Sequence, residues 1–215
     1  MTLISIIRRT LIKHIRNNSR VFFTLSLAFI IGVSAGAFAV NGLTAVQNEE
    51  LRHYISGFFQ LFQNQNVDNS ELFEISLAEN IKQILLLWIL GVTIIGIPFI
   101  FIIIGIRGFI TGFTSGFIFE ALGLKGIFFS VLALLPREII FIPCYIALGV
   151  SGINFSLNII KSKSSKHLSK DSLKSNFFAY CAVTLFYSGL VFLGILAESY
   201  ITPVIIRIIS PLMTN

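Results

Sequence analysis

The chain has 215 residues, of which 55% are hydrophobic and 12% are charged, and its formal net charge is +6. Soluble domains carry about 25% charged residues, so this composition excludes an ordinary water-soluble domain and favours a single membrane domain. Nucleic acid is not an expected partner, because the basic residues sit beside apolar runs with no folded domain to present them. Two cysteines within apolar runs and three scattered histidines predict no disulfide and no metal site.

Two basic clusters predict the orientation of the chain. One precedes the first apolar run, and the other fills a loop at 161–175. Loops rich in lysine and arginine beside membrane spans remain in the cytoplasm. With five crossings, the amino terminus is predicted to be cytoplasmic and the carboxyl terminus extracytoplasmic.

The first forty residues are predicted to be a membrane anchor. Residues 1–20 alternate apolar and basic side chains, which is typical of an amphipathic helix on an anionic leaflet; a plain topological anchor is the alternative. The run 21–40 would be about 30 Å long as a helix, the thickness of the hydrocarbon core. Ala37 and Ala39 resemble a signal-peptide cleavage site. The long basic leader and the length of the run favour an uncleaved span instead.

Residues 41–82 are the only long polar stretch, and their acidic excess favours the extracytoplasmic side. A turn precedes Asp68, which is expected to cap a second helix. The stretch is therefore predicted to be a helical hairpin. Phe58, Phe59 and Phe62 are candidates for binding a partner. The alternative is that they dip into lipid or pack on the protein's own spans.

Two spans are predicted next, at 84–106 and 108–122, with Arg107 between them on the cytoplasmic side. Pro98 is expected to kink the first of these spans, since proline removes a backbone donor. The second carries glycines at four-residue spacing, which allow another backbone to approach closely. That face packs either on this chain's own helices or on a partner's span. The predicted helix-packing residues are Gly32, Gly36, Gly108, Gly112 and Gly116.

Two further spans complete the five. Arg107 and the lysine loop are both expected inside, so the residues between them must cross twice. Two crossings leave some of these residues over, and we expect the remainder to form a re-entrant half helix that turns back at Pro136 and is buried in protein. The remaining segments are the half helix and turn at 127–138, a span at 139–160, the basic loop at 161–175, a span at 177–197 and an extracytoplasmic tail at 198–215. The predicted fold class is all-α and polytopic, with one domain over 1–215.

Charged residues near membrane depth are candidate functional groups. They are Arg107, Glu120, Arg137, Glu138 and Glu198. One interpretation is a polar pathway or ion site around Pro136. The other is that Arg107, Glu120 and Glu198 mark span ends while Arg137 and Glu138 pair in the turn. No nucleophile lies near a base at catalytic spacing, so no catalytic residue, no cofactor and no enzymatic activity are predicted.

Apolar, glycine and proline motifs follow one another at 87–91, 95–98, 108–117, 134–136 and 142–143. Their order and spacing resemble the stage II sporulation protein M family. Length, outer loop, number of spans and lysine loop agree as well, so the resemblance covers nearly the whole chain. It implies a bacterial multi-pass protein of the mother-cell septal membrane that acts in engulfment during endospore formation.

The resemblance also implies partners. They are a lytic transglycosylase, stage II sporulation protein D, and an amidase and endopeptidase, stage II sporulation protein P, which the family member holds together without catalysis. Membrane lipid is the other expected partner, and a homo-oligomer is compatible with the sequence. The alternative function is a small transporter or channel component that uses Pro136, Arg137 and Glu138. The wider superfamily has a histidine, a glycine and a glutamate where this chain has Arg137, Glu138 and Phe141.

Overall fold

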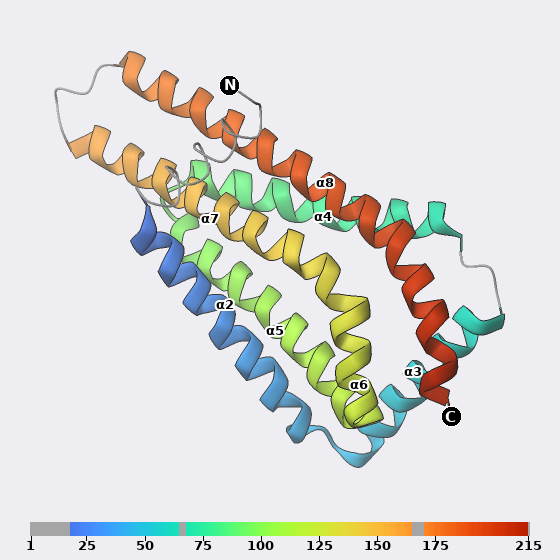
Figure 1. Ribbon diagram of the computed structural model, residues 1–215. Helices are drawn as coiled ribbons and strands as arrows, with labels where there is room; N and C mark the ends of the chain where they lie inside the picture. Colours follow the sequence, from blue (N-terminus) through green and yellow to red (C-terminus); the bar gives the residue numbers. More distant parts are fainter. Residues whose placement is uncertain (1–17, 65–67, 165–169, 215) are drawn as a thin grey trace.

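The computed structural model describes residues 18–64, 68–164 and 170–214, and all the regular elements within these ranges are helices (Figure 1). Five helical segments are long and apolar enough to cross a membrane, as the sequence predicts. Their helices are α2 (Ser19–Ala39), α4 (Asn69–Val92), α5 (Gly96–Leu122), α7 (Leu135–Ser164) and α8 (Lys170–Thr214). The predicted amphipathic helix lies outside the described residues up to residue 17, and the middle of the basic loop does so at 165–169.

Four shorter elements complete the described fold. They are η1 (Val40–Gly42), α3 (Ala45–Asn64), α6 (Leu124–Phe129) and the π-helical η2 (Ser130–Leu134). Helix α3, α6 and the end of α8 gather at one end of the bundle, here called the α3 end (Figure 1). The start of α2, the junction between α4 and α5, the end of α7 and the start of α8 lie at the other end. The chain therefore passes between two ends five times, in agreement with the predicted topology.

The junction between the second and third spans is at 93–95, so the prediction that Arg107 separates them is wrong. Pro98 lies in the first turn of α5, where its missing N–H removes no helical hydrogen bond, so it begins a helix instead of kinking one. The Ser156 hydroxyl donates to the carbonyl oxygens of Gly91 and Thr93 at 2.7 and 2.8 Å. The Gly91 carbonyl is one that the end of α4 leaves free, and the Thr93 carbonyl also accepts from the backbone N–H of Gly96 at 3.2 Å. Arg107 consequently lies in the middle of α5.

The second arm of the predicted outer hairpin belongs to a span. Helix α4 begins at residue 69, so residues assigned from sequence to the outer segment 41–82 form the first half of a membrane helix. Asp68 caps it as predicted, accepting from the backbone N–H of Ser70 at 2.8 Å. Helix α3 packs on α8. Because the first half of α4 contains polar residues, hydropathy alone does not identify it as part of a span.

Residues 124–164 do not turn back at Pro136. Helices α6, η2 and α7 follow one another without a non-helical residue, so the chain crosses the bundle in one bent segment (Figure 1). The reversal lies earlier, at Gly123, whose φ of 61° is a conformation that favours glycine. Pro143 lies inside α7, and an internal proline is a common cause of helix bending. The surplus residues that suggested a half helix are taken up by this long segment.

Helix α7 forms the centre of the bundle, because residues 144–153 are buried on every face. The core around it includes Leu25, Ile100, Tyr145, Val150 and Val191. Helix α2 packs along α5 with backbones in close approach. A Cβ on Gly32 or on Gly112 would lie under 3.0 Å from a carbonyl oxygen of the facing helix. The two predicted glycine faces therefore meet each other within this chain.

Candidate functional site

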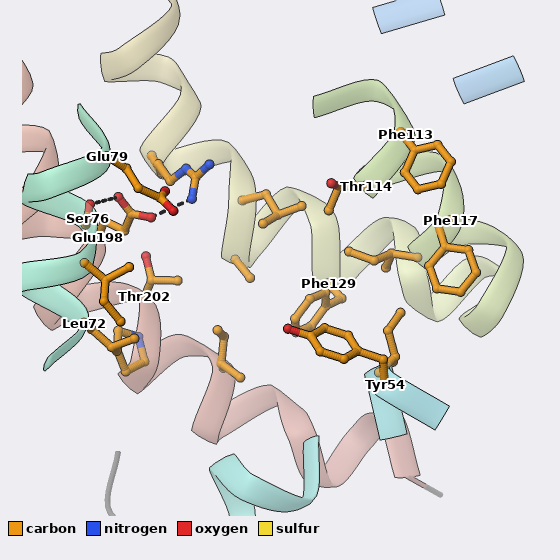
Figure 2. Close-up of a pocket in the computed structure, with 18 of the residues that line it drawn as sticks. Tyr54, Leu72, Ser76, Glu79, Phe113, Thr114, Phe117, Phe129, Glu198 and Thr202 are labelled. Carbon is orange, nitrogen blue, oxygen red and sulfur yellow. Dashed lines mark hydrogen bonds and ion pairs between the residues drawn. The ribbon is translucent and has the colours of Figure 1, made fainter. Parts of the chain in front are cut away.

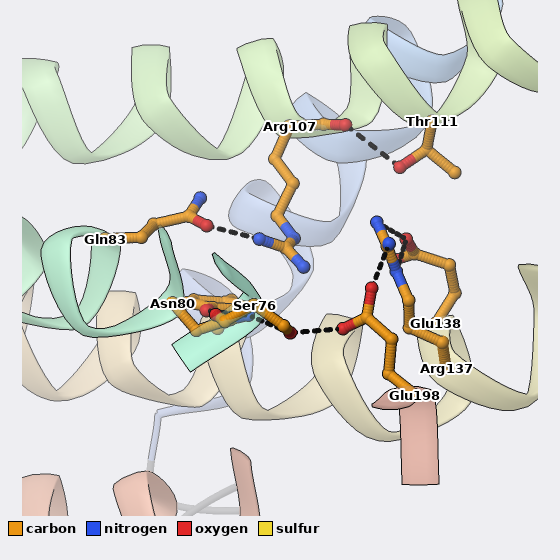
Figure 3. Close-up of polar contacts among 9 residues, drawn as sticks. Ser76, Asn80, Gln83, Arg107, Thr111, Arg137, Glu138 and Glu198 are labelled. Carbon is orange, nitrogen blue, oxygen red and sulfur yellow. Dashed lines mark hydrogen bonds and ion pairs between the residues drawn. The ribbon is translucent and has the colours of Figure 1, made fainter. Parts of the chain in front are cut away.

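A group of polar side chains crosses the interior of the bundle and is the candidate functional site (Figure 3). Its members come from α4, α5, α7 and α8, and we call it the polar cluster. They are Ser76, Asn80, Gln83, Arg107, Arg137, Glu138, Tyr145 and Glu198. Polar groups inside a membrane protein must find partners within the protein, since lipid offers none.

Arg137 connects α7 to α8. Its Nη1 lies 2.5 Å from Oε1 of Glu198, and its Nη2 lies 3.3 Å from Oε1 of Glu138. Glu138 is buried, and the side chain of Glu198 is 20% exposed. The Ser76 hydroxyl donates to the second oxygen of Glu198 at 2.6 Å, which joins α4 to the same group. Three helices are thus linked through the Glu198 carboxylate.

The cluster continues through α4 to Arg107. Asn80 donates to the backbone carbonyl of Ser76 at 2.7 Å and accepts from the Tyr145 hydroxyl at 2.5 Å. The Arg107 guanidinium lies 3.9 Å from the centre of the Tyr145 ring, a cation–π contact, and also donates to Gln83. An arginine in the middle of α5 is therefore held by an aromatic face and an amide, without a direct ion pair among the described residues.

The charges of the cluster balance. Arg107 and Arg137 oppose Glu138 and Glu198, so the formal charge is zero. Ions removed from water are tolerated when they are paired and hydrogen-bonded. Two buried atoms, Nε of Arg107 and Oε2 of Glu138, have no hydrogen-bond partner among the described residues. The cluster is thus close to fully satisfied internally, with one open donor and one open acceptor.

The structure brings together four of the five charged residues singled out from the sequence. Arg107 and Glu198 are not span ends, because both lie within long helices, so that interpretation is wrong for them. Glu120 does lie near a span end. It is exposed at the α3 end and accepts from Asn48 of α3 at 2.5 Å. Arg52 of α3 also donates to the backbone carbonyl of Glu120 at 3.2 Å.

Four members of the polar cluster are not among the residues predicted from the sequence. Ser76, Asn80 and Gln83 lie four and three residues apart, which places them on one face of a helix. That spacing is a usable signal, but the predicted outer hairpin at 41–82 includes Ser76 and Asn80 and separates them from the spans. Tyr145 gives no such signal, because a tyrosine in an apolar run is equally suited to a core position or a lipid interface.

A cavity of about 460 Å³ lies beside the cluster, towards the α3 end (Figure 2). Ser76, Glu79, Arg137 and Glu198 line one part of it, and Tyr54 of α3 lines another. Most of its remaining wall is apolar. The side chains of Phe58, Phe59 and Phe62 lie outside those that the structure describes. Within the described residues, no group of three His, Cys, Asp or Glu side chains could hold a metal ion.

Five membrane-spanning segments around an internally paired polar cluster define a multi-pass helical membrane protein. The sequence model of the family described as stage II sporulation protein M matches residues 25–203. The chain belongs to the stage II sporulation protein M family, as the motif resemblance predicts, and is a sporulation-related membrane protein. No curated protein and no solved structure matches it significantly.

Proposed function

We propose that this protein is a non-catalytic membrane scaffold that holds extracytoplasmic peptidoglycan-degrading enzymes during engulfment in endospore formation. The observation that carries the proposal is the family match over residues 25–203. The polar cluster is compatible with it, since its charged and uncharged side chains contact one another across four helices. Such a cluster stabilises one arrangement of the spans, as a scaffold requires.

The proposed partners are stage II sporulation protein D, a lytic transglycosylase, and stage II sporulation protein P, an amidase and endopeptidase. The proposed location is the mother-cell membrane at the septum, with the amino terminus in the cytoplasm. In that orientation the α3 end faces the cell wall, because the end of α7 and the start of α8, which flank the basic loop, lie at the opposite end (Figure 1). Helix α3 would then be available to enzymes on the extracytoplasmic side.

Co-purification tests the scaffold directly. The tagged full-length protein is expressed with both full-length hydrolases and isolated in mild detergent. We expect both enzymes to be recovered with it, and replacement of residues 46–69 by a short glycine-serine linker to reduce their recovery. Cleavage of peptidoglycan by the purified protein alone, or failure to recover either enzyme, would contradict the proposal.

Transport is the alternative function, and one observation favours it: Arg137 lies on the wall of a cavity. Transporters bind their substrates at polar, water-accessible sites near the membrane midplane. Here the wall is mostly apolar, and the Arg137 guanidinium is bound to Glu138 and Glu198. An ion flux into liposomes that contain the purified protein, abolished by Arg137→Ala, would favour transport over the scaffold.

A further inference from the structure

The carboxylate of Glu79 differs from the other acidic groups near the cavity. Glu138 and Glu198 are bound by Arg137, and Glu198 also accepts from Ser76. Glu79 lines the same cavity with an exposed side chain, and no hydrogen bond or ion pair to it is present within the described residues. The cavity therefore contains one carboxylate without a partner.

The position of Glu79 makes an unpaired charge costly. It lies ten residues into α4, about 15 Å along the helix axis, within a segment long and apolar enough to cross a membrane. Ionisable residues inside membrane segments are rare and usually mark functional sites. A carboxylate there gains most from a cation that is brought to it by a binding partner.

The charge of the cavity wall has the sign that such a partner requires. Glu79 and Glu198 oppose the single Arg137, so the formal charge of the wall is −1. Because Arg137 already binds two carboxylates, it does not compensate Glu79. The surrounding surface is apolar, with Leu72 and Ile75 from α4 and Phe113 and Phe117 from α5. The site is therefore suited to a ligand that is largely apolar and carries one positive charge.

We propose that this cavity receives a lysine or arginine side chain from a membrane-spanning helix of a partner protein, and that Glu79 is its counter-ion. The proposal rests on the scaffold function and deepens it by naming the surface and the partner's chemistry. A lipid tail would fill the apolar part but would leave Glu79 unpaired, since cationic lipid headgroups stay at the interface. A basic side chain on an apolar helix satisfies both parts of the wall.

Charge substitution tests the counter-ion. The full-length protein is co-expressed with the two hydrolases, and recovery is measured for wild type, Glu79→Gln, Glu79→Lys and the matched control Glu74→Lys. Glu74 is exposed on the same helix but does not line the cavity. We expect Glu79→Lys to reduce recovery of at least one hydrolase about tenfold, in the range of polar contacts between membrane helices. Glu74→Lys should leave recovery unchanged, and a basic residue in the partner's span changed to glutamate should restore binding to Glu79→Lys.

Photocrosslinking identifies the occupant independently. A benzoylphenylalanine at Ile75, on the cavity wall, should crosslink to a hydrolase, whereas one at Ile89, exposed on α4 away from the cavity, should not. Crosslinks from Ile75 to lipid alone or to a second copy of this chain would overturn the proposal. Unchanged recovery with both Glu79 variants would also overturn it while leaving the scaffold function standing. If wild type recovers neither enzyme, the scaffold function itself fails.

Discussion

Two helix interfaces in this bundle differ in the residues that form them. Helices α2 and α5 meet through glycines, with backbone against backbone. Helices α4, α7 and α8 share apolar core contacts and one close approach between Gly91 and Gly152, and are joined in addition by hydrogen bonds and ion pairs between polar side chains. In lipid there is little hydrophobic drive between helices, so close packing and polar contacts are the two available sources of association. The comparison shows both in one chain of 215 residues.

The glycine interface should be the more sensitive of the two to a single substitution. In Gly112→Leu the new Cβ would lie under 3.0 Å from the backbone of Val33, which cannot move without displacing α2. We expect a loss of about 3 kcal/mol in the free energy of unfolding, or failure to fold. Unfolding of the purified protein in mixed micelles measures it. Gly189→Leu is the matched control, because nothing lies within 4 Å of a Cβ there; equal losses in both variants would contradict the packing argument.

Breaking the ion pair between α7 and α8 should cause the second-largest loss in the free energy of unfolding. Glu198→Gln leaves Arg137 with only Glu138, and removes the charged acceptor of Ser76. We expect a loss of about 2 kcal/mol, less than for a fully buried pair because the Arg137 side chain is 35% exposed. The same unfolding assay applies. Glu120→Gln, an exposed carboxylate at the α3 end, should cost less than Glu198→Gln; the reverse order would refute the importance of the polar cluster.

Removal of a single neutral hydrogen bond should cause the third-largest loss in the free energy of unfolding. Tyr145→Phe removes the bond to Asn80 but retains the ring beneath Arg107. The expected loss is about 1 kcal/mol. Combining it with Asn80→Ala in a double-mutant cycle should give a coupling of similar size. Strictly additive losses would show that the two side chains do not interact.

The smallest effect is expected where α3 meets the end of α5. Arg52→Ala removes donors to the backbone carbonyls of Glu120 and Ala121 at 3.2 and 3.4 Å, all at exposed positions. We expect a loss of about 0.5 kcal/mol in global stability, together with faster amide hydrogen exchange in α3, which would lose a local contact. Glu50→Ala, also exposed on α3, serves as the control. Unchanged exchange in Arg52→Ala would show that this contact does not hold α3.

The sequence indicated the glycine interface well and the polar cluster only in part. Gly32, Gly36, Gly108 and Gly112 recur at helical spacing, and close packing between membrane helices requires small residues at that spacing. The sequence marks Arg107 and Glu198 as charges near membrane depth but leaves open whether they belong to a polar pathway or to span ends. Their partners are on other helices, and no local pattern indicates which helices will be neighbours. The predicted boundary between the second and third spans is also wrong. The break at 93–95 between α4 and α5 has apolar residues on both sides, so hydropathy does not indicate it.

The sequence by itself determined the class of the protein, its five apolar spans and the small-residue faces, because hydropathy and helical periodicity are local properties. The tertiary structure alone decided that the helix capped by Asp68 continues into the second span, that 124–164 form one bent segment, and that Arg107 binds Tyr145 and Gln83. These outcomes depend on contacts between residues far apart in the chain. A polar residue in a membrane helix is stabilised only by the neighbours that the fold brings to it.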